Sequence, residues 1–193
     1  FETLAATIDG LESSQITAPA RLERPIVYPE TFKEYASRFA TRDAFLARYP
    51  FFAASGTVGV VLRAGEYRIA QDVIIPQGLR VTIEPGVTLK FAPAISLISY
   101  SPVDARGTSA SRIRLMGDGS KPGEPWGVFT VIDATEAPSQ FAYLEVRGGK
   151  NRPWQGMFIT SQFDLRGIRS NVEHSLFADA YGDDGMHVAA GTT

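Results

Sequence analysis

One short pattern returns three times in the last third of the chain, and it limits the folds that the chain can adopt. The three copies run from Trp126 to Val131, from Trp154 to Ile159 and from Asp183 to Val188. In each copy, a polar or aromatic corner leads through a glycine into an apolar-x-apolar segment, and the copies follow one another after 28 or 29 residues. A period of this length with no helical spacing inside it predicts a solenoid of short strands and turns.

The register of the copies decides which side chains face the interior, since a slip of one residue turns a strand over. We align the two tryptophans, because this register makes both inward columns wholly apolar. The predicted columns are Phe129, Met157 and Met186, and Val131, Ile159 and Val188. The outward residues in this register are Thr130, Phe158 and His187.

A second set of columns is expected between these copies, with steps of 28 and 31 residues. Its members are Ile113, Phe141 and Val172, then Met116, Leu144 and Ser175, then Val146 and Phe177. Variation in the step is what insertions in the turns of a solenoid produce. Each coil is therefore expected to carry at least two strands.

From residue 56 onward, short segments rich in β-branched residues alternate with Gly and Pro turns, which predicts strands throughout. The predicted strands are Val58–Leu62, Tyr67–Ile69, Val73–Ile75, Leu79–Ile83, Val87–Phe91, Ser96–Ile98, Val103–Ala105 and Ile113–Met116. Strands at this spacing also occur in sandwiches and barrels. The long-range period favours a parallel β-helix.

Residues 1–55 have a different pattern and are expected to form an extended and helical cap. Apolar residues at helical spacing predict a helix over Thr31 to Phe39 and a second over Thr41 to Tyr49, which Pro50 ends. Pro19, Pro25 and Pro29 precede them and indicate an extended segment. An amphipathic helix at the end of a solenoid covers apolar side chains and strand edges, and an independent binding helix is the alternative.

The stretches Gly65 to Ile69, Val73 to Gly78 and Val81 to Phe91 resemble the opening coils of right-handed parallel β-helix proteins of the pectate-lyase-like superfamily. Trp126-Gly127 and the segment from Asp183 to Val188 are similar to the later coils of that family. The resemblance covers residues 56–193. It implies an all-β fold, a right-handed parallel β-helix with a small N-terminal helical cap. The superfamily includes lyases, hydrolases, epimerases, adhesins and proteins without known activity.

Composition excludes several classes of protein. The formal net charge of −2 argues against a general nucleic-acid binder, which needs a basic surface. No apolar run approaches the ~18 residues of a membrane-spanning helix. The absence of cysteine excludes disulfides, thiol nucleophiles and cysteine-bound metals.

The acidic turn of the third copy carries the main catalytic hypothesis. Asp183, Asp184 and His187 lie there, and Arg169 lies on a nearby turn as a candidate base. The family resemblance implies that such lyases often use Ca²⁺ to neutralise a uronate, and Asp183 and Asp184 are the candidate ligands. The alternative is that Asp183-Asp184-Gly185 is an ordinary turn whose side chains bind backbone amides.

Glycoside hydrolysis is a second chemistry open to these carboxylates, because it needs two of them about 5–9.5 Å apart. Asp183 or Asp184 with Asp164 or Glu145 are the candidate pairs across neighbouring coils.

Two tryptophans are the candidate sugar-binding residues. Trp126 and Trp154 are expected to stack on one edge of the solenoid, where aromatic faces bind sugar rings and Arg152 binds an acidic group. The alternative is that both indoles shield turns.

Two functional hypotheses follow. One is a module outside the cytoplasm, secreted, periplasmic or on the cell surface, that binds or processes polysaccharide. The other is a non-catalytic scaffold that supports structure, adhesion or binding of a partner. In either case, the segment Ala189 to Thr193 has no large apolar side chain that could cover the end of the stack. The C-terminal end is therefore expected to need further coils, a second copy or a partner chain.

Overall fold

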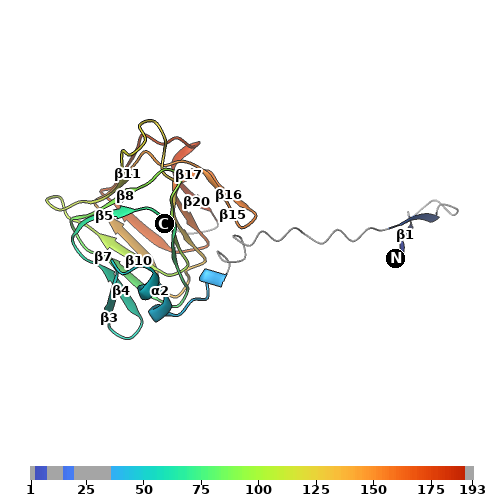
Figure 1. Cartoon of the computed structure of the whole chain (residues 1–193), viewed down its shortest axis with the longest axis horizontal. Helices are drawn as coiled ribbons and strands as arrows, with labels where there is room; N and C mark the ends of the chain where they lie inside the picture. The colour runs from blue at the N-terminus through green and yellow to red at the C-terminus, as the bar shows by residue number, and fades with distance from the viewer. Residues whose placement is uncertain (1–2, 8–14, 20–35, 190–193) are drawn as a thin grey trace.

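The computed structural model describes residues 3–7, 15–19 and 36–189 (Figure 1). Within the first two ranges, β1 (Thr3–Thr7) and β2 (Gln15–Pro19) form an antiparallel pair. The predicted helix over Thr31 to Phe39 begins outside the described residues. Pro25 and Pro29 also lie outside them. No described helix has the length and apolar character that crossing a lipid bilayer requires.

Most strands between residues 59 and 189 belong to three parallel sheets. The first sheet contains β4 (Gly59–Leu62), β7 (Arg80–Ile83), β10 (Val103–Arg106), β13 (Ser139–Ala142) and β18 (Ser170–Glu173). The second contains β5 (Gly65–Ile69), β8 (Val87–Phe91), β11 (Ile113–Gly117), β14 (Leu144–Arg147) and β19 (Leu176–Ala178). The third contains β6 (Val73–Ile75), β9 (Leu97–Ser99), β12 (Phe129–Ile132), β17 (Ser161–Arg166) and β20 (Asp184–Ala189).

The chain visits the three sheets in the same order on each pass, from β4, β5 and β6 to β18, β19 and β20. We call each pass a coil and number the coils 1 to 5 along the chain. Every strand of one coil pairs in parallel with its counterpart in the next. The prediction of an all-β fold with stacked parallel strands is therefore confirmed, and the arrangement is consistent with a β-solenoid.

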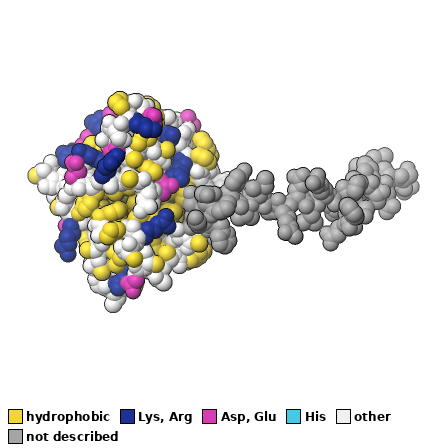
Figure 2. Space-filling view, viewed as in Figure 1, with side chains coloured by type: hydrophobic (Ala, Val, Ile, Leu, Met, Phe, Trp, Pro, Cys, Tyr) yellow, Lys and Arg dark blue, Asp and Glu magenta, His cyan; other side chains and the backbone are white. Residues whose placement is uncertain are grey.

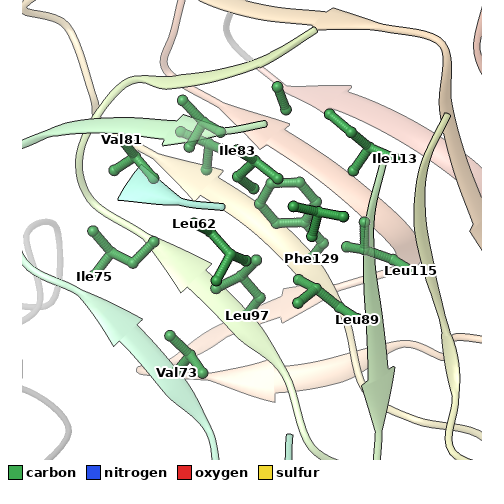
Figure 3. Close-up of a cluster of buried hydrophobic side chains, with 14 of the residues drawn as sticks. Leu62, Val73, Ile75, Val81, Ile83, Leu89, Leu97, Ile113, Leu115 and Phe129 are labelled. Atoms are coloured by element: carbon green, nitrogen blue, oxygen red, sulfur yellow. The ribbon is translucent and has the colours of Figure 1, made fainter. Parts of the chain in front are cut away.

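The interior of the stack is built from columns of apolar side chains, one per coil. The strand Val87–Phe91 shows how this arises: its first, third and fifth residues are buried, and the residues between them are less so. One column runs through all five coils as Tyr67, Leu89, Leu115, Val146 and Phe177. Figure 3 shows side chains of such columns pointing toward one shared interior.

Aromatic rings fill the interior of the later coils. Phe129, Phe141 and Phe163 contact one another edge to face, with ring centroids 5.1–5.9 Å apart. All three side chains are at most 1% exposed. Edge-to-face contact places the positive ring edge against the negative ring face, so these rings add directional attraction to their burial.

The predicted columns of the third sheet were wrong at their middle member. Phe129 and Met186 do belong to one column, but Phe163 lies between them, and Met157 does not. Likewise, Leu165 and not Ile159 lies between Val131 and Val188. Thr130 and His187 do share one column, but Asp164 lies between them, and the predicted Phe158 belongs to another strand pair.

The cause of this error is an inserted hairpin. β15 (Arg152–Trp154) and β16 (Met157–Ile159) pair antiparallel between β14 and β17, outside the three parallel sheets. Gln155 and Gly156 turn the chain with φ values of +46° and +80°, the left-handed conformation that a two-residue hairpin turn of type I′ requires. The apolar-x-apolar spacing of β16 is the same as that of β17, so spacing alone could not distinguish them.

The second set of predicted columns was partly right. Phe141 pairs with Val172, and Val146 pairs with Phe177, as expected. Ile113, however, pairs with Leu144 and not with Phe141, since the two belong to different sheets.

The predicted helix over Thr41 to Tyr49 is confirmed as α2 (Arg42–Arg48). The Thr41 hydroxyl accepts a hydrogen bond from the Ala44 amide at 3.2 Å, so Thr41 is the N-cap. Phe45 and Tyr49 are buried and belong to the main core. After the helix, β3 (Ala53–Ser55) pairs antiparallel with β4 and covers the outer edge of the first sheet.

The aromatic interior gives a testable prediction. We expect Phe141→Ala to lower the free energy of unfolding by about 3–5 kcal/mol, because it removes a buried ring and leaves a cavity. Phe158→Ala is the control, since Phe158 is 52% exposed and its truncation is expected to cost no more than about 0.5 kcal/mol. Urea unfolding followed by circular dichroism measures both, and equal losses would contradict the column packing.

Candidate functional site

The outer face of the third sheet is covered, and this sets it apart from an ordinary solvated sheet face. Seven buried side chains form a second apolar cluster there, separate from the interior of the stack: Ile74, Ile98, Tyr100, Val128, Ile132, Trp154 and Ile159. Trp154 and Ile159 come from the hairpin β15–β16, and the others come from coils 1 to 3. The hairpin therefore lies across several coils and removes their outer side chains from water.

Polar contacts hold the hairpin in place through its first strand and its turn. Arg152 forms a two-point ion pair with Asp72, at 2.8 and 2.7 Å, and donates to the Ser96 hydroxyl at 2.9 Å. The Trp154 indole N–H donates to the Tyr100 hydroxyl at 2.9 Å, and that hydroxyl donates to the Gln155 side-chain oxygen Oε1 at 3.0 Å. These contacts join coil 4 to coils 1 and 2.

A buried carboxylate lies at the centre of the remaining outer face. Asp164 in β17 has a side chain with no exposed surface. It accepts hydrogen bonds from Arg166 at 2.6 and 3.0 Å and from the Thr130 hydroxyl at 3.4 Å, and the His187 Nδ1 atom lies 3.0 Å away. Asp164 is thus surrounded by donors from three successive coils.

This cluster is the candidate functional site, because it places a carboxylate and an imidazole in contact, a pair that can transfer a proton. A buried carboxylate beside one ring nitrogen fixes the orientation of an imidazole, as in hydrolytic triads. The His187 side chain is 35% exposed, so the ring is within reach of solvent. No described residue completes the arrangement as a nucleophile next to His187. The contacts shown by the structure are those of a charge cluster that holds strands together.

The other predicted catalytic residues lie apart from one another. Asp183 and Asp184 are exposed where β20 begins, and the Asp183 amide donates to the Thr160 carbonyl at 3.1 Å. Arg169 is exposed on the turn after β17, beyond the opposite end of the third sheet. β20 has 6 residues, and a strand of that length spans about 20 Å. The structure therefore brings His187 to Asp164 and not to Arg169.

The calcium hypothesis finds no ligand set among the described residues, since no three His, Asp or Glu side chains there gather closely enough to hold a metal ion. Asp179 and Glu173, near the same turns, have other contacts: Asp179 pairs with Arg147 at 2.7 Å, and Glu173 accepts from Asn171 at 2.7 Å.

Among the carboxylates proposed for glycoside hydrolysis, Asp164 and Glu145 form ion pairs with arginines. Glu145 pairs with Arg147 at 2.7 Å and with Arg114 at 3.5 Å on the outer face of the second sheet. The hydrogen bond from Arg147 holds the pKa of Glu145 below its ordinary value. A general acid needs the opposite shift, so Glu145 is unsuited to that role.

Neither tryptophan offers a face to a sugar ring. Trp126 has no exposed surface and stacks on Phe91 with ring centroids 4.6 Å apart, while its indole N–H donates to the Arg147 carbonyl at 2.7 Å. Trp154, the last residue of β15, is 2% exposed and packs in the second apolar cluster. Arg152 lies near the rim of a surface pocket of about 490 Å³, which Ala94, Gly127, Lys150, Asn151 and Pro153 also line.

Several residues of this face were missed by sequence reasoning. Asp72, Ser96 and Tyr100 were not predicted as site residues, although all three contact the hairpin. One signal was present for the cluster itself. An acidic residue two positions before an arginine in one strand occurs at Glu66, Asp104, Glu145 and Asp164. The last three carboxylates pair with their own arginines, while Glu66 pairs with Lys90.

Comparison with known proteins gives one local likeness. The chain is 44% identical over 57 residues to a protein of Drosophila melanogaster named "Protein bark beetle". The likeness covers 28% of this chain and 2% of that protein, so the chain spans a small part of that relative. No family model matches the sequence, and no solved structure matches it.

The charge cluster gives a prediction with an internal control. Arg166→Met is expected to destabilise the fold by about 3–5 kcal/mol, because it leaves the Asp164 carboxylate buried without its main partner. Arg106→Met removes the same two-point pair from Asp104, whose side chain is 40% exposed, and is expected to cost no more than about 1 kcal/mol. Urea unfolding at neutral pH measures both variants, and similar losses would show that burial of Asp164 does not matter.

Proposed function

We propose that this chain is a non-catalytic scaffold, a segment of right-handed parallel β-helix of the pectate-lyase-like kind that acts outside the cytoplasm. Its role is to hold a rigid, elongated surface for a partner. The stacked parallel coils support the fold named in this proposal. The ion pairs made by its carboxylates support a non-catalytic role.

The observation that carries the proposal is that carboxylates suited to chemistry are neutralised by neighbouring side chains. Asp164 is paired with Arg166, Glu145 with Arg147, and Asp72 with Arg152. A catalytic acid or base needs a perturbed pKa and access to substrate. Asp164 and Glu145 pair with arginines of their own strands, and Asp72 with Arg152 joins coil 1 to coil 4, so these carboxylates serve structure, which is what a scaffold needs.

The charge distribution of the surface agrees with this role. Figure 2 shows a face on which hydrophobic side chains gather in the middle and charged side chains of both signs are interspersed around them. On the second sheet, Lys90 pairs with Glu66 at 2.7 Å and Arg68 pairs with Asp118 at 2.9 Å. The first pair joins the neighbouring strands β5 and β8 and supports their register, and the second joins β5 of coil 1 to the turn after β11 of coil 3.

Activity assays test the proposal. The purified chain is incubated with pectate, alginate and neutral glycans, with and without Ca²⁺, and unsaturated uronate absorbance and reducing ends are followed. We expect no turnover above buffer, while an authentic lyase in the same buffer serves as positive control. Turnover that disappears in His187→Gln or Asp184→Asn would overturn the scaffold proposal, because those residues belong to the rejected site.

Binding of an acidic polysaccharide is a second candidate function, and the pocket beside Arg152 favours it. Lys150 lines this pocket and has no ion pair among the described residues. Asn151 adds an amide that can donate to a carboxylate or hydroxyl oxygen. Because Asp72 neutralises Arg152, the net positive charge of the pocket comes from Lys150.

A glycan array followed by titration calorimetry tests the second candidate. Lys150→Gln is expected to weaken binding of uronate-containing oligosaccharides about three- to tenfold at low salt, since one charged contact is lost. Lys121→Gln is the matched control, because Lys121 pairs with Glu124 on a distant turn. Equal effects of both substitutions, or no glycan bound at all, would exclude this pocket as a glycan site.

A further inference from the structure

The turn between β3 and β4 borders a polar surface pocket that lies apart from the candidate site. Its volume is about 440 Å³, and residues of β7 also line it. In Figure 1 these strands lie at the lower left, whereas the hairpin β15–β16 lies at the right. The lining of the pocket includes Ser55, Gly56, Thr57, Val58, Arg80 and Thr82. It therefore offers three hydroxyl groups and one guanidinium, and none of the described residues that line it is acidic.

Arg80 gives the pocket its charge, and this charge is not compensated. The residue is exposed at the start of β7, and no ion pair or side-chain hydrogen bond within the described ranges occupies its guanidinium. Asp104 lies opposite Thr82 in the next coil, but Arg106 already holds it in a two-point pair. The Arg80 guanidinium is therefore available to an anion.

Two hydrogen-bond partners hold the turn between β3 and β4 in one orientation. Arg42, the first residue of α2, donates to the Gly56 carbonyl at 2.8 Å and to the Thr57 carbonyl at 2.6 Å. The Val58 carbonyl accepts a hydrogen bond from the Arg80 amide at 3.1 Å. Gly56 has a φ of +59°, a left-handed conformation that glycine adopts without strain. The turn is thus fixed before any ligand arrives.

This orientation leaves two backbone amides as free donors. In a planar trans peptide, the N–H points opposite to the C=O of the same peptide unit. Because the carbonyls of Gly56 and Thr57 point toward Arg42, the amides of Thr57 and Val58 point away from it. Neither amide donates to an acceptor in the described part of the chain. Successive free amides in a turn are a common anion-binding arrangement.

The donors of this pocket match a tetrahedral oxyanion. A guanidinium donates two parallel hydrogen bonds to two oxygens of a carboxylate, sulfate or phosphate. A carboxylate has only those two oxygens, whereas a tetrahedral anion has further oxygens for the amides of Thr57 and Val58. The pocket volume of about 440 Å³ is larger than such an ion requires, so the molecule that carries the anion has room as well.

We propose that this pocket binds a sugar through an ester sulfate or ester phosphate group. Arg80 binds two oxygens of the ester, and the amides of Thr57 and Val58 bind the others. The hydroxyls of Ser55 and Thr82 both donate and accept, as the hydroxyl groups of a sugar ring require. The site goes beyond the scaffold role, because it assigns a ligand to the side of the first two coils.

Nuclear magnetic resonance of the backbone amides of the whole chain tests the proposal. Inorganic sulfate and the primary sulfate and phosphate esters of glucose are titrated separately into isotope-labelled protein, with chloride keeping the ionic strength constant. We expect saturable shifts of the Thr57 and Val58 amide signals, with tighter binding of a glucose ester than of inorganic sulfate. Comparison of the two esters identifies the preferred group. Added salt is expected to weaken binding, because the pocket is open to water.

Three substitutions locate the ligand. Arg80→Met is expected to weaken binding of the glucose ester about tenfold or more, because both the charge and the two-point contact are lost. Arg80→Lys keeps the charge without the planar fork, so it is expected to restore only part of the affinity. Thr82→Val removes one hydroxyl and is expected to cost roughly two- to fivefold. The last two variants keep the test valid if Arg80→Met disturbs folding.

Two controls separate this pocket from general charge effects. Arg63→Met removes another exposed arginine, which pairs with Glu84 at 3.9 Å, and it should leave binding unchanged. Lys150→Gln removes the cation of the pocket beside Arg152 and should also have no effect.

Several results would overturn the proposal. Shifts at Thr57 and Val58 that chloride alone reproduces, or equal weakening by Arg80→Met and Arg63→Met, would show a general salt effect. Binding no tighter for the glucose esters than for inorganic sulfate would show adsorption of an ion only. Weakening by Lys150→Gln and not by Arg80→Met would place the ester in the other pocket. All these results leave the scaffold role intact, whereas enzymatic turnover would end that role without moving the two amide signals.

Discussion

The structure depends on pairing and covering the edges of parallel strands. Each strand of a coil uses one edge for the preceding coil and offers the other to the next, so the backbone hydrogen bonds run along the whole stack. The apolar columns follow from this arrangement, because parallel pairing in register places like side chains above one another. The first coil ends the series with a helix and an antiparallel strand, and neither element continues the parallel ladder.

Much of this fold was predictable from sequence, because strand and turn signals are local. The β-branched runs from Val73 to Phe91 and the Gly and Pro turns between them gave the strands of coils 1 and 2 within a residue or two. The helical spacing of apolar residues from Thr41 to Tyr49 and Pro50 after it predicted α2. Columns were harder to predict, because Met157 and Phe163 both occupy apolar-x-apolar segments and only the pairing of β17 distinguishes them.

The candidate site was less predictable, because burial and not residue type decides what an acid–arginine pair does. Asp104 with Arg106 and Asp164 with Arg166 have the same spacing and nearly the same two-point geometry. The first pair is exposed to water, and the second has its carboxylate fully buried beside His187. Sequence spacing cannot reveal that difference, since Thr130 and His187, which flank Asp164 in the neighbouring coils, lie 34 and 23 residues from it along the chain.

The inserted hairpin changes the kind of unfolding that the molecule can undergo. In an ideal solenoid, each repeat touches only its neighbours, and end repeats can melt independently of the middle. Here Arg152 of coil 4 reaches Asp72, 80 residues earlier in the sequence, and Trp154 packs with side chains of coils 1, 2 and 3. Opening an inner coil therefore disturbs the contacts of the hairpin with the third sheet. Detaching the hairpin in turn exposes apolar side chains of several coils at once. The hairpin thus gives a modular stack the all-or-none thermodynamic behaviour of a compact domain.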